Sequence, residues 1–219
     1  RTIRANLRHY QAEYRTIIPE TRIGHGRRSR GSLKDVILCI DQSGSMANSV
    51  VYSSIFGAVM ASLPAVSTRL VVFDTEVVDL SDEMDDPVEV LFSVQLGGGT
   101  DINRAVGYCE SRITRPEDTV LVLISDLYEG GVEAGLLAKA QRLVGAGVQV
   151  VALLALSDEG APSYDRALAA RLAALGVPAF ACTPDLFPDM MAAAIRKTDL
   201  NAWAAGAGIA AVPAAGDPA

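Results

Sequence analysis

Residues 36–46 read VILCIDQSGSM, an apolar run that passes directly into a polar loop. Five consecutive apolar residues, Val36–Ile40, predict a strand that is buried on both faces, as the strands of a covered parallel sheet are. Two further apolar runs follow, at 119–125 (TVLVLIS) and at 148–156. The segments between these runs carry apolar residues at helical spacing. The chain therefore alternates between buried strands and helices.

The expected elements between and around these strands complete the pattern. Apolar residues recur every three or four positions in 45–63, 102–113, 134–144, 164–175 and 187–195. Residues 70–73 and 76–80 predict a hairpin around Asp74-Thr75, residues 87–94 a short helix and residues 178–182 a short strand. Strands that alternate with helices predict a doubly wound, Rossmann-like α/β fold. We expect a mostly parallel sheet with one antiparallel edge strand and helices on both faces.

The distribution of charge predicts three regions. Residues 1–31 contain eight Arg and two Glu, a net charge of +6, whereas the rest of the chain carries −13. We interpret residues 1–32 as a basic arm with a mostly helical stretch over 1–18, and 33–200 as the folded domain. Residues 201–219 are rich in Ala, Gly and Pro and predict a flexible tail. Because the chain begins with Arg1 instead of Met, the arm is expected to be the end of a longer upstream region.

Composition limits the class of protein. Half of the residues are hydrophobic and the net charge is −7, which argues against a disordered chain and against a uniformly basic nucleic-acid binder. Three Cys without a close pair indicate neither a disulfide framework nor a zinc site. No apolar stretch approaches the roughly 20 residues that span a bilayer, and no secretory signal is found. We therefore expect a cytoplasmic protein without a membrane span.

Polar residues gather where the predicted strands end. Asp41, Ser43 and Ser45 follow the first buried strand, Thr100 follows the glycine loop 97–99, and Asp126 follows the strand 119–125. In an open α/β sheet, ligands bind at the carboxyl ends of the strands. All five side chains offer only oxygen atoms, which hard divalent cations such as Mg²⁺ prefer. The sequence therefore predicts a metal site, while the plainer alternative is a helix cap at 41–45 and ordinary turn residues elsewhere.

At DQSGS, GGGTD and the strand-terminal SD, the sequence resembles the von Willebrand factor type A (VWA) family over about residues 34–198. In that family, D-x-S-x-S, a loop Thr and a loop Asp form the metal-ion-dependent adhesion site, or MIDAS. The resemblance implies that Mg²⁺, or Mn²⁺ or Ca²⁺ in its place, is held by Asp41, Ser43, Ser45, Thr100 and Asp126. It also implies that the hydroxyls contact the ion directly, that one or both Asp act through water, and that a Glu or Asp of a partner protein completes the shell.

The stretches TIRANLRHY, YRTIIPE and ILCIDQSGSM resemble the bacterial CoxE-like branch of this family. This resemblance implies a protein-binding module and not an enzyme. It further implies a module that works beside a MoxR-type AAA+ ATPase, in metal-cofactor insertion or in the remodelling of protein complexes. In that branch the domain is typically the C-terminal part of a longer protein.

Four further residues border the predicted metal site. Asp74 is either a hairpin turn residue or a group near the metal, and Asp101 is either a helix cap or a group that assists the metal or the partner. Tyr128 and Glu129, next to Asp126, are candidates for the rim that contacts a partner.

Two other functions stay open on the sequence alone. The first is a Mg²⁺-dependent phosphotransfer enzyme with Asp41 as nucleophile, although the Ser at 43 stands where such an enzyme would want a second acid. The second is an RNA-associated protein that uses the Arg-rich arm. A Ser-His-Asp hydrolase is disfavoured because both His lie in the arm and no G-x-S-x-G occurs. No P-loop motif exists, and no G-x-G-x-x-G follows the first strand.

Overall fold

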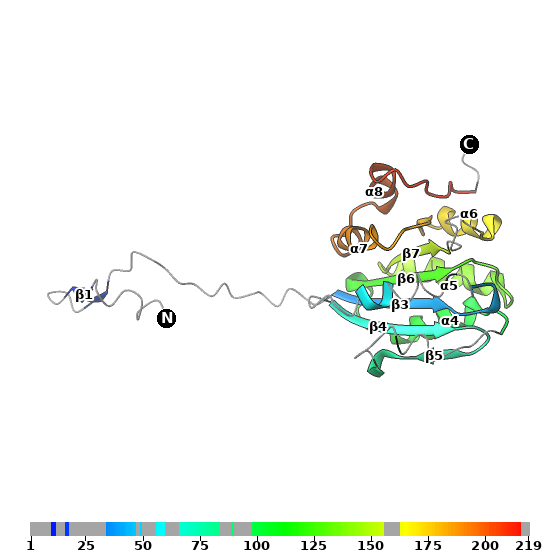
Figure 1. Cartoon of the computed structure of the whole chain (residues 1–219), viewed down its shortest axis with the longest axis horizontal. Helices are drawn as coiled ribbons and strands as arrows, with labels where there is room; N and C mark the ends of the chain where they lie inside the picture. Colours follow the sequence, from blue (N-terminus) through cyan, green and yellow to red (C-terminus); the bar gives the residue numbers. More distant parts are fainter. Residues whose placement is uncertain are drawn as a thin grey trace. The chain divides into compact units, whose positions relative to one another are not determined.

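The structure, a computed structural model, describes residues 10–11, 16–17, 34–46, 49, 56–59, 66–83, 89, 98–155 and 163–215 (Figure 1). The chain divides into two compact units, residues 1–32 and residues 33–219. In the first unit, β1 (Tyr10–Gln11) pairs antiparallel with β2 (Thr16–Ile17). The helix predicted over 1–18 is therefore wrong at these positions. Tyr, Thr and Ile favour strands, and the spacing of so few apolar residues does not separate a helix from a hairpin.

The second unit contains a six-stranded sheet in the order β5-β4-β3-β6-β7-β8. The strands are β3 (Lys34–Asp41), β4 (Val66–Phe73), β5 (Val77–Asp79), β6 (Thr119–Ser125), β7 (Gln149–Leu154) and β8 (Ala179–Phe180). All neighbours pair parallel except β4 and β5, which pair antiparallel at one edge. The predicted doubly wound, Rossmann-like α/β fold with one antiparallel edge strand is confirmed.

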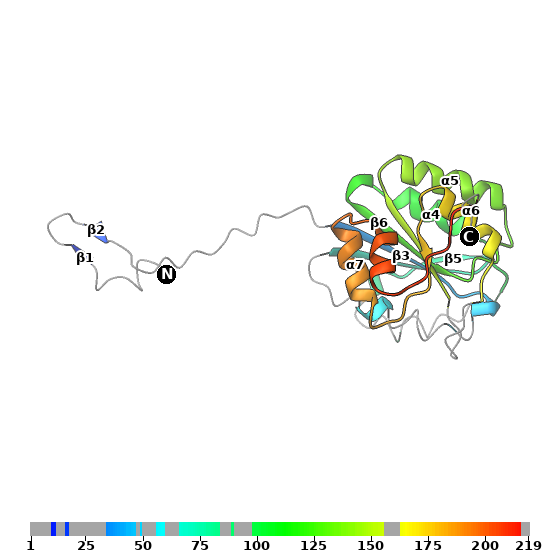
Figure 2. The ribbon, with the colours of Figure 1, turned by 90° about the horizontal axis from the view of Figure 1, so that it is seen from above.

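Helices cover both faces of this sheet (Figure 2). On one face, α4 (Ile102–Arg112), α5 (Glu133–Gly145) and α6 (Arg166–Ala174) share an apolar cluster with Ile37 and Cys39 of β3. On the other face, α7 (Phe187–Ile195) and α8 (Leu200–Gly206) pack in a cluster with Val36, Leu38 and Ile40. Successive side chains of a strand point to opposite faces, so a strand covered on both sides needs apolar residues at every position. This requirement explains the uninterrupted run 36–40.

The helices predicted at 45–63 and 87–94 lie largely outside the described residues. Residues 44–46 form a 3₁₀ turn, and residues 56–59 and Glu89 are helical. The helix and strand ranges predicted after residue 100 agree with α4, β6, α5, β7, α6, β8 and α7 to within a few residues at each end. No helix among the described residues is long and apolar enough to cross a membrane.

The segment after Leu200 differs from the predicted flexible tail. Asp199 caps α8 by accepting hydrogen bonds from the backbone N–H groups of Asn201 and Ala202. The ring of Trp203 lies 5.8 Å from that of Phe180, centroid to centroid, and Ala211 forms a β-bridge with Phe180. The Ala-rich composition misled the prediction because small residues pack closely once a sheet edge is available to cover.

Candidate metal centre

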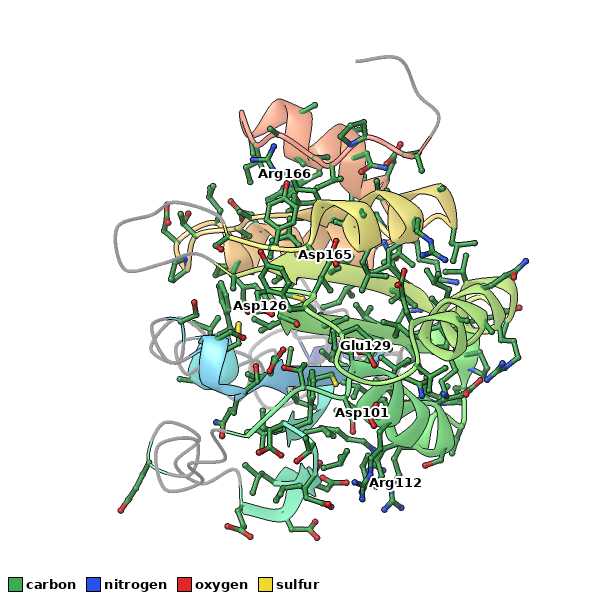
Figure 3. All side chains as sticks on the ribbon, turned by 90° about the vertical axis from the view of Figure 1, so that its right-hand side faces the viewer. Asp101, Arg112, Asp126, Glu129, Asp165 and Arg166 are labelled. Atoms are coloured by element: carbon green, nitrogen blue, oxygen red, sulfur yellow. The ribbon has the colours of Figure 1, made fainter. Side chains whose placement is uncertain are left out.

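The sheet order places the two predicted acidic ligands side by side. Strands β3 and β6 are parallel neighbours with Ile40 opposite Ile124, so Asp41 at the end of β3 lies beside the Ser125-Asp126 end of β6. The chain also reverses its direction of winding at β3, since β4 and β6 flank it on opposite sides. Such switch points are where open α/β sheets bind ligands. Figure 3 looks onto the carboxyl edge of the strands, with Asp126 labelled.

Asp41 is fully buried and both of its carboxylate oxygens accept hydrogen bonds. Oδ1 accepts the backbone N–H of Ser43 at 2.9 Å, and Oδ2 accepts the hydroxyl of Ser125 at 2.6 Å. Burial raises the pKa of Asp41, the two serines lower it, and the negative charge of Asp126 raises it further. The two buried carboxylates follow the adjacent ends of β3 and β6, so they repel each other when both are ionised.

Ser43 and Ser45 place two hydroxyls next to Asp41. The 3₁₀ turn Gly44–Met46 brings the two Oγ atoms to 3.2 Å from each other. Ser43 is buried, whereas Ser45 is exposed. The backbone N–H of Gly44 donates to the carbonyl oxygen of Gly98 at 3.1 Å, which joins this turn to the loop that carries Thr100. Two hydroxyls on one side of a buried carboxylate form a set of hard oxygen donors.

Asp126 is held by a kink in the backbone directly after β6. Leu127 has a φ of 62° and a fully buried side chain. This left-handed conformation strains a leucine by about 1–3 kcal/mol, so it persists only where the surroundings enforce it. The N–H of Leu127 donates to Ser125 Oγ at 2.9 Å, and the N–H of Tyr128 donates to Asp126 Oδ1 at 3.2 Å. The kink turns the chain at the strand end and keeps Asp126 buried beside Asp41.

Thr100 lies in a loop that contacts both neighbouring strand ends. Its carbonyl oxygen accepts the N–H of Gly130 at 3.0 Å, and the next residue, Asp101, donates its N–H to the carbonyl of Asp74 at 2.8 Å. The structure therefore brings together the loops of all five predicted ligands. Asp41, Ser43, Ser45 and Asp126 are linked by side-chain hydrogen bonds or by charge, and Thr100 by its backbone.

The four bordering residues have distinct places. Asp101 is the N-cap of α4, and its Oδ1 accepts the N–H of Arg104 at 2.7 Å. Asp74 accepts the N–H groups of Glu76 at 2.7 Å and Gly98 at 3.0 Å. Tyr128 is exposed. The capping and turn roles considered for Asp101 and Asp74 are both present.

Glu129 is half-buried and faces the first turn of α4. Its carboxylate accepts the N–H of Ile102 at 2.8 Å, of Asn103 at 3.4 Å and of Gly131 at 3.0 Å. Burial raises the pKa of Glu129, the three N–H donors lower it, and the charge of Asp101 raises it. Glu129 thus contacts the protein's own backbone, and its place in a partner-facing rim stays a prediction.

Sequence reasoning undervalued Ser125 and Gly130. Ser125 donates to Asp41, and a Cβ atom on Gly130 would lie only 2.5 Å from the carbonyl oxygen of Thr100. The order Ser-Asp at the end of β6 is a usable signal for the first residue, because the parallel register sets Ser125 beside Asp41. For Gly130, the sequence shows only the pair Gly130-Gly131, and such a pair is also typical of ordinary turns.

The donor set fits a hard divalent cation. Two buried carboxylates repel each other, and none of the ion pairs between described residues includes Asp41 or Asp126. Buried charges are normally paired or coordinate a metal. In the described part of the chain, no three His, Cys, Asp or Glu side chains form a metal-binding group. A site here would therefore combine two carboxylates with hydroxyl oxygens, a composition that suits Mg²⁺ better than Zn²⁺.

Comparison with known proteins agrees with this architecture. The family model described as "VWA domain containing CoxE-like protein" matches residues 1–191. The chain is also similar to the uncharacterized protein YehP of Escherichia coli (strain K12), with 41% identity over 184 residues. That match covers 84% of this chain and 49% of YehP, so the chain spans about half the length of this relative.

Solved structures share the fold at low sequence identity. An aerotolerance-related membrane protein from Bacteroides fragilis NCTC 9343 superposes with a TM-score of 0.60 and 16% identity, covering 75% of this chain and 100% of that one. The von Willebrand factor type A structure from Catenulispora acidiphila gives a TM-score of 0.58 and 15% identity, covering 74% of this chain and 42% of that one. At these identities the likeness shows the fold alone. Because the family model covers most of the chain, the protein belongs to the family of VWA domain containing CoxE-like proteins.

Proposed function

We propose that this protein is a non-enzymatic, metal-dependent protein-binding module that holds Mg²⁺ at a MIDAS, at the carboxyl ends of the parallel strands. Asp41, Ser43, Ser45, Thr100 and Asp126 would hold the ion. Bound there, the ion supplies positive charge that attracts a Glu or Asp carboxylate of a partner protein. The observation that carries the proposal is the burial of Asp41 and Asp126 at the adjacent ends of β3 and β6, beside the hydroxyls of Ser43 and Ser45.

The charge of this edge explains why a partner acid would depend on metal. Asp41 and Asp126 are joined there by Asp74, Asp101 and Glu129, so an approaching carboxylate meets several like charges. Like charges brought together at an interface cost several kcal/mol, by order of magnitude. A divalent cation would neutralise the charge of the two buried aspartates and offer a coordination position to the oxygen of the approaching carboxylate. Mn²⁺ or Ca²⁺ would serve in place of Mg²⁺ because both also take oxygen ligands.

The partner proposed for the module is a MoxR-type AAA+ ATPase, in the remodelling of protein complexes or in metal-cofactor insertion. Membership of the CoxE-like family supports this choice over the many other partners that VWA domains could take.

Capture of the partner tests the proposal directly. The immobilised chain is offered the MoxR-type ATPase of its own source organism, in buffer with Mg²⁺ or with EDTA. We expect retention with Mg²⁺ and its loss with EDTA, and a loss of about tenfold or more for Ser43→Ala, because one of the hard oxygen ligands is gone. Ser111→Ala, an exposed α4 serine that donates to the carbonyl of Tyr108, is the matched control and should bind normally.

The outcomes of this capture experiment are separable. Equal retention in EDTA and Mg²⁺ would contradict the metal-dependent mechanism. If the chain binds Mn²⁺ but does not bind the ATPase, the proposed metal site stands and this partner is excluded. Hydrolysis of a generic phosphoester that Asp41→Asn abolishes would instead favour the phosphotransfer enzyme.

Tyr128 is expected to contact the partner without contributing to metal binding. Among the described residues, the exposed large hydrophobic side chains are Tyr128, 49% exposed, and Val132, 62% exposed, both in the loop between Asp126 and α5. Tyrosine is enriched among interface residues that dominate binding energy. Tyr128→Ala should weaken partner binding about tenfold, roughly 1.4 kcal/mol, with an unchanged Kd for Mn²⁺.

Titration calorimetry with the partner and with Mn²⁺ alone checks both statements. Tyr128→Phe is the control for the ring, since it removes only the hydroxyl and should retain most of the affinity. Partner binding that is as tight for Tyr128→Ala as for the unsubstituted protein would exclude Tyr128 from the interface.

A further inference from the structure

One carboxylate of the β6–α5 loop, that of Glu129, contacts the protein's own backbone. Glu129, in the β6–α5 loop, accepts N–H groups of Ile102 and Asn103 in the first turn of α4. The first N–H groups of a helix have no partner within the helix and need one from outside. Asp101 satisfies Arg104, and Glu129 satisfies the two residues before it. Figure 3 labels Asp126, Glu129 and Asp101 at this edge.

The backbones of the β6–α5 loop and of the Thr100 loop approach each other closely. The N–H of Gly130 donates to the carbonyl oxygen of Thr100 at 3.0 Å. A Cβ atom at position 130 would lie 2.5 Å from that oxygen, so any other residue forces the two loops apart. The loop that follows Asp126 is therefore fastened at two neighbouring points: the side chain of Glu129 binds the first turn of α4, and the backbone of Gly130 binds Thr100.

The Thr100 loop is also held from its other side, by Asp74. Asp74, directly after β4, accepts the N–H of Gly98 at 3.0 Å through Oδ2, and its carbonyl accepts the N–H of Asp101 at 2.8 Å. A Cβ atom on Gly98 would lie 2.6 Å from Asp74 Oδ2. Residues 98–101 are thus held from the end of β4 and from the end of β6 at the same time.

We infer that Glu129 and Asp74 are positioning residues that clamp residues 98–103, Asp74 from the loop side and Glu129 from the first turn of α4, and so set Thr100 relative to Asp41 and Asp126. This inference rests on the proposed metal-binding function and assigns roles to two carboxylates that would not hold the ion themselves. Both oxygens of each carboxylate accept backbone N–H groups, which ties each side chain to the backbone on either side of it. Groups that orient metal ligands commonly change metal affinity by 10–100-fold when they are removed.

The test compares Glu129→Gln, Glu129→Ala and Asp74→Asn with the unsubstituted chain. Glu117→Gln is the matched control, since Glu117 is an exposed carboxylate just before β6, at the amino ends of the strands. The first readout is amide hydrogen exchange at Ile102, Asn103 and Gly131 without metal. The second is the Kd for Mn²⁺ alone, measured by electron paramagnetic resonance.

For the Glu129 variants we expect graded effects. Exchange at Ile102 should rise about tenfold or more in Glu129→Ala, because a hydrogen bond to a charged acceptor is lost. The Kd of Glu129→Ala for Mn²⁺ should rise about tenfold. The Kd of Glu129→Gln should lie between those of Glu129→Ala and the unsubstituted chain, because its side chain keeps one acceptor oxygen. Asp74→Asn should raise exchange at Gly98 and also raise the Kd for Mn²⁺. The control should change neither readout.

The failures are distinguishable. Mn²⁺ binding by the unsubstituted chain together with normal Mn²⁺ binding by the Glu129 and Asp74 variants would overturn the clamp and leave the metal site intact. No Mn²⁺ binding by the unsubstituted chain would remove the metal site and the inference with it. Should a carboxylate variant fail to fold, Gly130→Ala takes its place, since it separates the same loops and should raise the Kd for Mn²⁺ similarly. A normal Kd for folded Gly130→Ala overturns the clamp.

Discussion

Asp41→Asn is expected to abolish tight metal binding while leaving the fold intact. The substitution removes one of the two buried negative charges of the donor set, so the Kd for Mn²⁺ should rise by at least about 100-fold, roughly 2.7 kcal/mol. The amide still fits the site. Its oxygen can accept the N–H of Ser43, and its NH₂ group can donate to Ser125 Oγ.

Thermal unfolding with and without metal measures this effect. At a metal concentration of about 100 times the Kd, binding stabilises the folded state by about 2.7 kcal/mol. For a domain of this size that corresponds to a rise in Tm of roughly 5–10 °C. This rise should be present in the unsubstituted protein and absent in Asp41→Asn. In EDTA, Asp41→Asn should be at least as stable as the unsubstituted protein, because the repulsion from Asp126 is relieved.

Asp35→Asn provides the control, since Asp35 lies at the other end of the same strand and pairs there with Arg115 at 2.9 Å. It should retain the metal-induced rise in Tm. An Asp41→Asn variant that shows the same rise as the unsubstituted protein would remove Asp41 from the metal site and with it the proposed mechanism.

Phe187→Ala is expected to cause the largest loss of stability. Phe187 is fully buried at the start of α7, and its ring centroid lies 4.3 Å from that of Phe56. Truncation of a buried aromatic ring leaves a cavity and costs about 3–5 kcal/mol. Domains are typically stable by only about 5–15 kcal/mol, so the variant should unfold at a much lower urea concentration.

Urea denaturation followed by circular dichroism measures this loss. Phe187→Leu fills most of the space and should lose clearly less stability than the alanine variant. The Kd for Mn²⁺ of the folded Phe187→Ala protein should be unchanged, because Phe187 belongs to the apolar cluster of Val36, Leu38 and Ile40 and not to the polar edge. A loss below about 1 kcal/mol would show that α7 is not anchored through this ring.

The layered fold could be predicted because its signal is local. A strand covered on both faces is continuously apolar, and β3 and β6 are such strands. The helices after residue 100 show the spacing of one buried face. The arm and the tail were predicted less well, because two-residue strands leave almost no periodicity and because α8 depends on the contact of Trp203 with Phe180. Contacts between distant residues leave no periodic trace in the sequence.

The sequence by itself determined which residue types end the buried strands, and hence the five oxygen-bearing candidates for a metal site. The tertiary structure alone decided that β6 lies beside β3, which brings Asp126 near Asp41 and sets Ser125 against its carboxylate. It also turned Glu129 inward, onto the N-terminus of α4. The physical reason is that an exposed glutamate and one that satisfies helix N–H groups have the same local sequence, and only the packing of a distant helix end distinguishes them.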